Sequence, residues 1–317
     1  MSIIEKAVGR LGRGKGEKDV SPDVAGADAE PLIAAKERRT LVERAAAADR
    51  AIAPESAVIA ERPVVTEAPK IKQPTPSSRV VELNLDKLHE MGMVTPDGGR
   101  SAVAEEFRAI KRTLIDKAFK KDAIPSKRSN LIMVTSSLPG EGKTFCAINL
   151  AISIAMELDH TVLLVDADVA RPSILRNLGL KAGAGLMDVL LDRNLDVADV
   201  MLKTNVDTLS ILPAGTSHRH ATELLASQAM RTLLDEISAR YADRIVIFDS
   251  PPLLLTTEAS VLASQMGQIV MVIEAEKTTQ KAVKNALHQL ESCPNVNLIY
   301  NKANAFPGGE KYGFYYG

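Results

Sequence analysis

The latter part of the chain alternates short apolar runs with stretches of helical periodicity. A fully apolar strand suits a sheet that is covered on both faces, and a helix between two such strands makes a right-handed crossover between parallel strands. The pattern therefore predicts an α/β fold, with a mainly parallel sheet and helices on both faces. The expected strands are residues 130–136, 161–165, 208–212, 244–248, 268–273 and 296–300. The expected helices are residues 101–119, 143–158, 172–179, 222–240, 257–265 and 278–292.

The beginning of the chain has a composition that opposes folding. The first aromatic residue is Phe107, and residues 1–79 hold 7 of the 16 prolines. Such a segment cannot bury enough apolar surface to offset the entropy of ordering it. Within it, residues 2–11 have one apolar helical face, which is either a frayed end or a docking helix. The chain is expected to divide into a largely disordered linker region over 1–80, a folded domain over 81–305 and a flexible, tyrosine-rich tail over 306–317.

Composition excludes several classes of protein. The formal net charge is −1, from 39 basic and 40 acidic residues, which gives no global attraction to nucleic acid. The two cysteines, Cys146 and Cys293, rule out a disulfide framework and indicate a reducing compartment. The longest mostly apolar run, 146–158, is too short to span a membrane, and the first residues lack the apolar core of a signal peptide. We therefore expect a cytoplasmic protein with no nucleic-acid partner.

A glycine-rich loop joins the first apolar strand to the helix that follows it. This order suits a phosphate site, because glycines let backbone N–H groups turn inward and the helix N-terminus adds positive potential. Lys143 is placed to reach the outer phosphates, and the hydroxyl of Thr144 to bind Mg²⁺. Ser137 stands where the strict P-loop pattern has a glycine. The loop reads Ser136-Ser137-Leu138-Pro139-Gly140-Glu141-Gly142-Lys143-Thr144.

Carboxylates follow two of the expected strands. Asp166 and Asp168 come after residues 161–165, and Asp249 comes after residues 244–248. Because the carboxyl ends of parallel strands share one edge of a sheet, the three side chains should meet beside the glycine-rich loop. Asp249 is the better partner for Mg²⁺, and Asp166 or Asp168 is suited to accept a proton from an attacking hydroxyl.

Together these motifs resemble those of the bacterial tyrosine kinases, which are P-loop ATPases related to the MinD and ParA proteins. Residues 135–144 (TSSLPGEGKT) resemble the family's Walker A motif, and residues 165–172 (VDADVARP) resemble its second, Asp-x-Asp motif. Residues 245–252 (IVIFDSPP) resemble its Walker B motif. The resemblance extends over about 101–317. It implies a P-loop fold and a protein-tyrosine kinase that uses ATP and Mg²⁺.

The resemblance gives roles to the candidate site residues. It implies that Lys143, Asp166 and Asp168 are catalytic, and that Thr144, Asp166 and Asp249 hold the metal. Asn301 ends the last strand, where related ATPases contact adenine. The implied nucleotide-binding residues are Ser137, Pro139, Gly140, Glu141, Gly142, Lys143, Thr144, Phe145 and Asn301.

The tail and the first long helix resemble two further features of the family. The tail carries three of the five tyrosines, Tyr312, Tyr315 and Tyr316. In the family such a cluster is phosphorylated by the active site of a neighbouring subunit, so the resemblance implies a homo-oligomer, ring-like in arrangement. Glu105, Arg108 and Lys111 are similar to the family's Glu-x-x-Arg-x-x-Arg oligomerisation motif, with lysine as the last member.

Within the bacterial tyrosine kinases, the chain resembles the autokinases found with exosortase/PEP-CTERM-type exopolysaccharide loci. It implies a role in exopolysaccharide polymerisation and export, and activation by a membrane chain-length-determinant protein that recruits the chain to the inner face of the membrane. A cognate tyrosine phosphatase is a further expected partner.

Two alternatives stay open at this point. One is a MinD/ParA-like ATPase switch, whose signature lysine would stand at Leu138 and which gives the tail no role. The other is a scaffold that binds ATP without catalysis and docks a membrane partner. The complete set of catalytic residue types weighs against the scaffold. One departure from the kinase pattern is Ala170, where family members usually have an arginine.

Overall fold

The structure, a computed structural model, describes residues 79–119, 128–240, 243–293 and 295–303. Every described residue lies in the unit Pro74–Gly317. The expected linker with its helix over 2–11 and the expected tail over 306–317 lie outside the described residues. Those expectations stay predictions.

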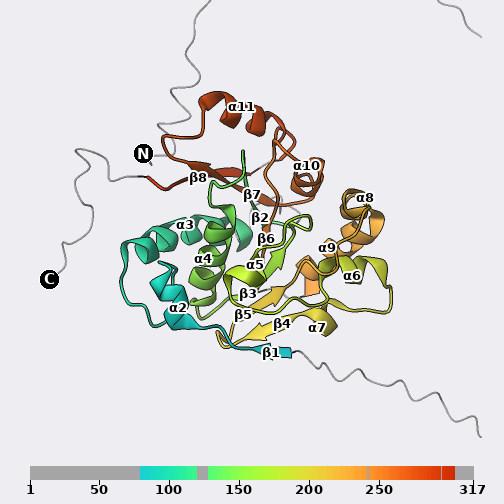
Figure 1. The fold of residues 1–317 in the computed structure, drawn as a ribbon, viewed down its shortest axis with the longest axis horizontal. Helices are drawn as coiled ribbons and strands as arrows, with labels where there is room; N and C mark the ends of the chain where they lie inside the picture. The colour runs from blue at the N-terminus through green and yellow to red at the C-terminus, as the bar shows by residue number, and fades with distance from the viewer. Residues whose placement is uncertain (1–78, 120–127, 241–242, 294, 304–317) are drawn as a thin grey trace, which may run out of the picture. The chain divides into compact units, whose positions relative to one another are not determined.

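One sheet of eight strands runs through the described part of the chain (Figure 1). The strands are β1 (Arg79–Val81), β2 (Leu131–Ser136), β3 (Thr161–Asp166), β4 (Leu202–Thr204), β5 (Leu209–Leu212), β6 (Arg244–Asp249), β7 (Gln268–Glu274) and β8 (Val296–Asn301). Their order in the sheet is β1-β4-β5-β3-β6-β2-β7-β8. Every neighbouring pair is parallel except β4 with β5. The strands predicted from the sequence form the continuous parallel part from β5 to β8, which confirms a mainly parallel sheet.

The strands that the sequence did not predict are the two shortest. β1 and β4 have three residues each and extend the sheet beyond β5 at one edge. A run of three residues is too short to display the alternation that marks a strand. Their pairing depends instead on the neighbouring strand β5, which is available only in the folded chain.

The described helices are α2 (Leu85–Glu90), α3 (Ala102–Phe119), α4 (Lys143–Ala155), α5 (Ile174–Asn177), α6 (Leu186–Leu191), α7 (Val197–Val200), α8 (Ala221–Leu225), α9 (Gln228–Arg240), α10 (Thr257–Ala263) and α11 (Gln280–His288). Helix is present in each range where the sequence predicts it, whereas α2, α6 and α7 were not expected. The single helix expected over 222–240 is wrong, because α8 stops before Ser227, whose hydroxyl accepts the N–H of Met230 and caps α9. Among the described helices, none is both long and apolar enough to cross a membrane.

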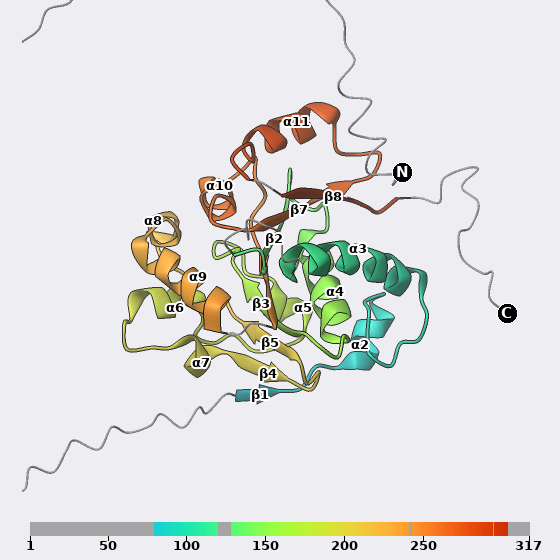
Figure 2. The ribbon, with the colours of Figure 1, turned by 180° about the vertical axis from the view of Figure 1, so that it is seen from behind.

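Side chains alternate between two cores, one on each face of the sheet. In β2, Leu131 and Met133 join the core that α6 to α11 cover, while Ile132 and Val134 join the core that α2 to α5 cover. All four are fully buried. The two groups of helices lie on opposite sides of the sheet in both views (Figures 1 and 2). β2 is thus covered on both faces. It ends in the glycine-rich loop, at the carboxyl edge of the sheet.

Candidate active site

The loop between β2 and α4 has the backbone conformation of a phosphate cradle. Gly140 and Gly142 have φ of 84° and 97°, in the left-handed region that glycine adopts without strain. Gly142 is the N-cap of α4 and supplies no side-chain cap, and the first turn of α4 carries no acidic residue. The free N–H groups and the positive end of the helix therefore favour an anion here. A Cβ built on Gly140 would meet nothing within 4 Å, so the space beside it is open.

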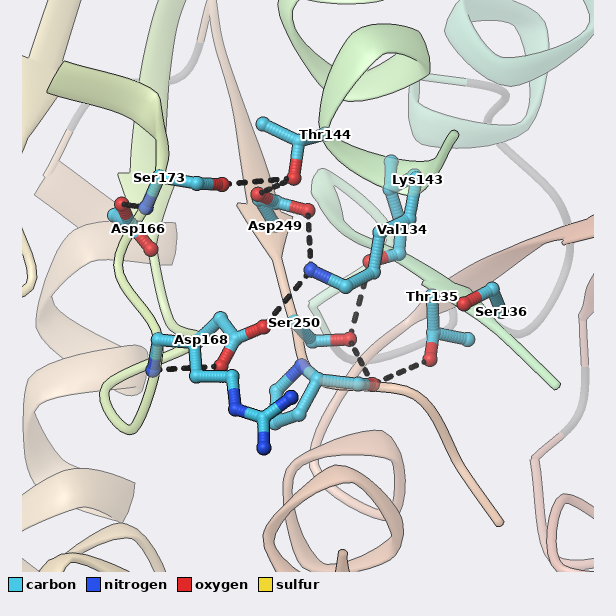
Figure 3. Close-up of polar contacts among 12 residues, drawn as sticks. Val134, Thr135, Ser136, Lys143, Thr144, Asp166, Asp168, Ser173, Asp249 and Ser250 are labelled. Atoms are coloured by element: carbon cyan, nitrogen blue, oxygen red, sulfur yellow. Dashed lines mark hydrogen bonds and ion pairs between the residues drawn. The ribbon is translucent and has the colours of Figure 1, made fainter. Parts of the chain in front are cut away.

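Lys143 lies between two of the predicted carboxylates (Figure 3). Its Nζ is 2.9 Å from Asp168 Oδ2 and 3.7 Å from Asp249 Oδ1. The Thr144 hydroxyl donates to Asp249 Oδ2 at 2.7 Å. β3 and β6 are paired so that Asp166 lies opposite Asp249. The structure thus brings together the lysine, the threonine and the three aspartates that the sequence nominated.

Asp166 is held by the segment that follows it. Its Oδ2 accepts the backbone N–H groups of Ser173, at 2.9 Å, and of Ile174, at 3.0 Å. Ser173 Oγ lies 3.0 Å from Thr144 Oγ1, which joins this segment to the first turn of α4. Ser173 was not predicted as a site residue. Its place before a helix, after Pro172, is a helix-start signal that would have drawn attention to it.

The site carries more negative charge than one lysine neutralises. Burial raises the pKa of Asp166 to about 6, against the hydrogen bonds from Ile174 and Ser173. Burial raises the pKa of Asp249 to about 7, against the attraction of Lys143. Burial lowers the pKa of Lys143, but Asp249 and Asp168 outweigh it, so the pKa lies above its ordinary value of 10.5. The ammonium is therefore charged at neutral pH, and the site still favours a further cation.

A nucleotide with Mg²⁺ fits these residues. Asp166 Oδ1 and Asp249 Oδ1 are buried and have no hydrogen-bond partner among the described residues, which suits a cation or its bound water. No group of three or more acidic, histidine or cysteine side chains in the described ranges is arranged to hold a metal alone. Phosphate oxygens and water would therefore complete the coordination of the ion, as is usual for Mg²⁺ beside a P-loop.

The glycine-rich loop is braced by residues from the end of β8 and the β7–α11 connection. The Asn301 side chain donates to the backbone oxygen of Glu141 at 2.9 Å, and Lys302 Nζ donates to that of Gly140 at 2.7 Å. The Thr278 hydroxyl donates to the Glu141 carboxylate, which is 2% exposed. Thr278 and Lys302 were missed, and no motif in the sequence marks them. Asn301 lies at the loop, and its expected contact with the adenine of a nucleotide stays a prediction.

The structure gives less direct support for the other residues that were predicted to bind the nucleotide. Ser137 is fully buried, and its hydroxyl has no partner among the described residues. Pro139 is exposed at the loop, and Phe145 packs partly buried against the core under α3 and α4. Phe145 is therefore explained by packing, and its role at the nucleotide stays a prediction.

The three residues of the expected oligomerisation motif lie on α3 in different surroundings. Glu105 is exposed, Arg108 is half-buried, and the two side chains pair with each other at 2.6 Å. Lys111 is 4% exposed. Its Nζ donates to the Ser153 backbone oxygen at 2.6 Å and pairs with Glu157 at 2.6 Å, so it caps the carboxyl end of α4. Lys111 therefore makes its contacts within one chain. The role of Glu105 and Arg108 in oligomerisation stays a prediction.

We expect Lys111→Met to lower the free energy of unfolding by about 1–3 kcal/mol at neutral pH, since a buried carbonyl loses its donor. The hydrogen bond from Lys111 is the main cause that lowers the pKa of Glu157 below its ordinary 4.5. The ion pair between Lys111 and Glu157 therefore stabilises the fold above about pH 4.5, the ordinary pKa of glutamate. This stability is lost as the pH falls through the lower pKa that Glu157 has in the folded protein. Urea unfolding at neutral and acid pH should show the deficit shrinking in acid. The control is Arg112→Met, an exposed neighbour; equal stability of the two variants would contradict the capping role.

The fold and the site define a P-loop nucleotide-binding enzyme. The AAA domain family matches residues 129–302, more than half of the chain. The chain is 31% identical over 218 residues to tyrosine-protein kinase YwqD of Bacillus subtilis (strain 168), covering 68% of this chain and 87% of YwqD. It is 31% identical over 240 residues to the succinoglycan biosynthesis transport protein ExoP of Rhizobium meliloti (strain 1021), covering 72% of this chain but only 29% of ExoP.

Solved structures agree with the relatives in sequence. The kinase domain of the Escherichia coli tyrosine kinase ETK superposes with a TM-score of 0.58 at 26% identity, over 70% of this chain and 84% of that domain. The chain therefore belongs to the bacterial tyrosine kinases, a family of P-loop phosphotransferases. The resemblance stated from the motifs is confirmed. Several relatives are much longer, and the chain spans less than a third of each of them.

Proposed function

We propose that this chain is an autokinase that transfers the γ-phosphoryl group of ATP to tyrosines in the tail of a neighbouring copy, at Tyr312, Tyr315 and Tyr316. The observation that carries the proposal is the position of Lys143, held at the glycine-rich loop by Asp168 and Asp249. This lysine can exchange an aspartate for phosphate oxygens without moving to a new part of the site.

The chain's own residues supply positioning and charge. The backbone around Gly140 and Gly142 binds phosphate oxygens, and Lys143 neutralises charge on the outer phosphates. Thr144 and Asp249 would hold Mg²⁺ with the phosphates, and the ion supplies a positive charge that stabilises the transferring group. Because the transition state for phosphoryl transfer is loose, fixed charges in these positions provide most of the catalysis.

The proposed step includes a base for the phenolic proton of the acceptor tyrosine. In the proposed step the tyrosine oxygen bonds to the γ-phosphorus while the bond from that phosphorus to the β,γ-bridging oxygen breaks, and ADP leaves with the electron pair. Asp166 takes the phenolic proton and later passes it to water. Asp166 suits this task because burial raises the pKa of its carboxyl to about 6, which makes it a better proton acceptor than an ordinary aspartate.

The role in the cell follows the family relationship. The name of the relative ExoP as a succinoglycan biosynthesis transport protein supports a part in exopolysaccharide polymerisation and export. In the proposed cycle the chain is cytoplasmic, assembles with its own copies, and is activated by a membrane chain-length-determinant protein and reset by a tyrosine phosphatase. Each phosphate adds about −1.5 to −2 charges to the tail, so repulsion loosens the assembly as phosphorylation proceeds.

The tail is tested by changing Tyr312, Tyr315 and Tyr316 to Phe together. After incubation with Mg-ATP, intact mass and phosphosite mapping should show phosphate on the tail of the unchanged chain and none on the triple variant. The matched control is Tyr300→Phe, an exposed tyrosine outside the tail, which should leave phosphorylation intact.

Transfer between copies is tested by mixing. The triple variant keeps its active site but lacks acceptors, and Lys143→Met keeps acceptors but lacks the lysine. Phosphate should appear on the tail of Lys143→Met only in the mixture. Steady ATP hydrolysis without phosphotyrosine, even with the membrane activator added, would instead favour the ATPase switch, and ATP binding without turnover would favour the scaffold.

A further inference from the structure

The outward face of α11 is basic. Lys281, Lys284 and His288 are spaced three and four residues apart, so they share one face of the helix, and all three are exposed. Ala286 is buried and belongs to the core on that side of the sheet. The helix contains no acidic residue, and His288 pairs with Glu291, which lies beyond its last residue. The helix therefore packs through an apolar face and presents positive charge to solvent.

Two of these cations are not neutralised by the fold. Lys277, in the turn before α11, lies 3.3 Å from Glu274, and the exposed Glu276 is its neighbour in sequence. Lys281 and Lys284 have no side-chain hydrogen bond or ion pair with any described residue. Lys277, Lys281 and Lys284 are called the α11 basic patch below. The excess positive charge of this patch lies at Lys281 and Lys284, where an anion can bind without displacing a carboxylate.

The described chain ends beside this patch. β8 is an edge strand, and its last residues pair with the end of β7, where Asn301 lies opposite Glu274. Lys302 Nζ and Lys277 Nζ each lie 3.3 Å from the same oxygen, Glu274 Oε2. In both views α11 lies next to β8 (Figures 1 and 2). The tail, residues 304–317, therefore follows directly from a point that adjoins the start of the patch.

The charge of the tail depends on phosphorylation. Residues 304–317 contain one acidic side chain, Glu310, and one basic side chain, Lys311. Their charges cancel, so the unmodified tail has no electrostatic attraction to the patch. Each phosphate on a tyrosine adds about −1.5 to −2 charges, and three add roughly −4.5 to −6. Phosphorylation thus creates the charge that the patch complements.

We propose that the phosphorylated tail docks on the α11 basic patch of its own copy. The inference rests on the proposed function, which supplies the phosphates. The nine residues from Ala303 to Tyr312 span up to roughly 30 Å when extended. α11 is only about 14 Å long, so a phosphate on Tyr312 can reach Lys281 and Lys284. Lysine binds phosphate as a point charge, which suits a tail that carries several phosphates.

Docking gives the tail a place after phosphoryl transfer. A tether of this length keeps the tail at a high effective concentration near the patch, so a weak intrinsic affinity is sufficient. The docked tail leaves the active site of the neighbouring copy free for another acceptor. Its phosphates are also shielded from a phosphatase while they are paired with lysine.

The surface is tested with a labelled peptide. The protein is the full chain with Tyr312, Tyr315 and Tyr316 changed to Phe, so that no phosphorylated tail of its own can occupy the patch. The probe is a fluorescein-labelled peptide of residues 304–317 that is synthesised with phosphate on all three tyrosines. Fluorescence anisotropy should show binding in saturating Mg-ADP, and the unphosphorylated peptide should bind at least about 10-fold more weakly.

Two double variants of this protein locate the site. Lys281→Gln with Lys284→Gln should raise the Kd of the phosphopeptide about 10-fold. The matched control is Lys87→Gln with Lys203→Gln, which removes the same charge from two exposed lysines on α2 and β4. This control should bind as the parent does. Equal weakening in the two double variants would overturn the assignment, as would displacement of the peptide by Mg-ADP, because the active site would then be the binding site.

The chain with its own tail phosphorylated shows which copy supplies the occupant. It should bind the labelled peptide at least about 10-fold more weakly than the Phe variant does, at every chain concentration. A block that grows with chain concentration would assign the patch to the tail of a second copy and overturn docking within one copy. In the phosphorylated chain, Lys281→Gln with Lys284→Gln should also lose phosphate faster than the parent when a tyrosine phosphatase is added.

The peptide is phosphorylated by synthesis, so its binding does not depend on kinase activity. A tail that is phosphorylated in Mg-ATP, together with a peptide that does not bind, would overturn the docking and leave the proposed function intact. If Mg-ATP produces no phosphate on the tail, the proposed function fails and the docking falls with it.

Discussion

Lys143→Met should abolish phosphoryl transfer and weaken the fold at the same time. The lysine is the cation closest to Asp168 and Asp249 among the contacts within the described site. Without it, charge on the outer phosphates is not neutralised, and we expect a loss of at least about 100-fold in the rate of tail phosphorylation. The buried carboxylates also lose their counter-ion. Breaking a buried ion pair in this way costs about 3–5 kcal/mol, so the melting temperature should fall clearly.

Lys143→Arg separates the two effects. Its charge is retained, so most of the lost stability should return, but the planar guanidinium cannot take the place of a point charge at the loop. Phosphorylation should stay at least about 10-fold below that of the unchanged chain. Calorimetry and phosphosite mass spectrometry on both variants provide the comparison. If Lys143→Met were as stable as the unchanged protein, the ion pairs seen at 2.9 and 3.7 Å would not hold the site together.

Asp166→Asn should also remove activity, but it should make the nucleotide-free protein more stable. The amide oxygen can still accept the N–H groups of Ser173 and Ile174, while the negative charge beside Asp168 and Asp249 is gone. Burial raises the pKa of Asp166 from 3.8 to about 6, which corresponds to about 3 kcal/mol of preference for the neutral form. We expect a stabilisation of up to that size, together with a loss of transfer of about 100-fold or more.

The stability measurement belongs in buffer with a chelator and without nucleotide, since a bound cation would reverse the benefit of removing the charge. The raised pKa means that the unchanged protein loses this stability as the pH rises from about 4 to about 6, and Asp166→Asn should not. The control is Asp207→Asn, an exposed aspartate, which should change stability by less than about 0.5 kcal/mol. A destabilised Asp166→Asn would show that the charge stabilises the folded protein.

The parallel sheet and the centre of the site were predictable because local sequence determines them. A strand that is buried on both faces needs a continuous apolar run. The glycine-rich loop needs Gly140 and Gly142 so that its backbone N–H groups can turn inward. Asp166 and Asp249 were predictable as neighbours because parallel strands end at the same edge, and their pairing in register confirms this.

The rest depends on contacts between distant parts of the chain. The brace on the glycine-rich loop joins Glu141 to Asn301, which are 160 residues apart, and no periodicity predicts such a pair. Lys111 has the spacing of a surface motif, yet α4 ends beside it and its ammonium is used there.

The position of β2 has a consequence for biosynthesis. Its partners both come later in the chain, since Leu131 pairs with Val246 and Ile132 pairs with Gln268. A ribosome adds roughly 5–20 residues per second, so the nascent β2 waits on the order of 10 s for its first neighbour. During that time a strand whose six residues are all buried in the folded protein lacks both of its neighbours, and its apolar residues are a target for chaperones. Because Asn301 and Lys302 complete the brace, the newly made enzyme should gain its ability to bind ATP only when translation has passed the last strand.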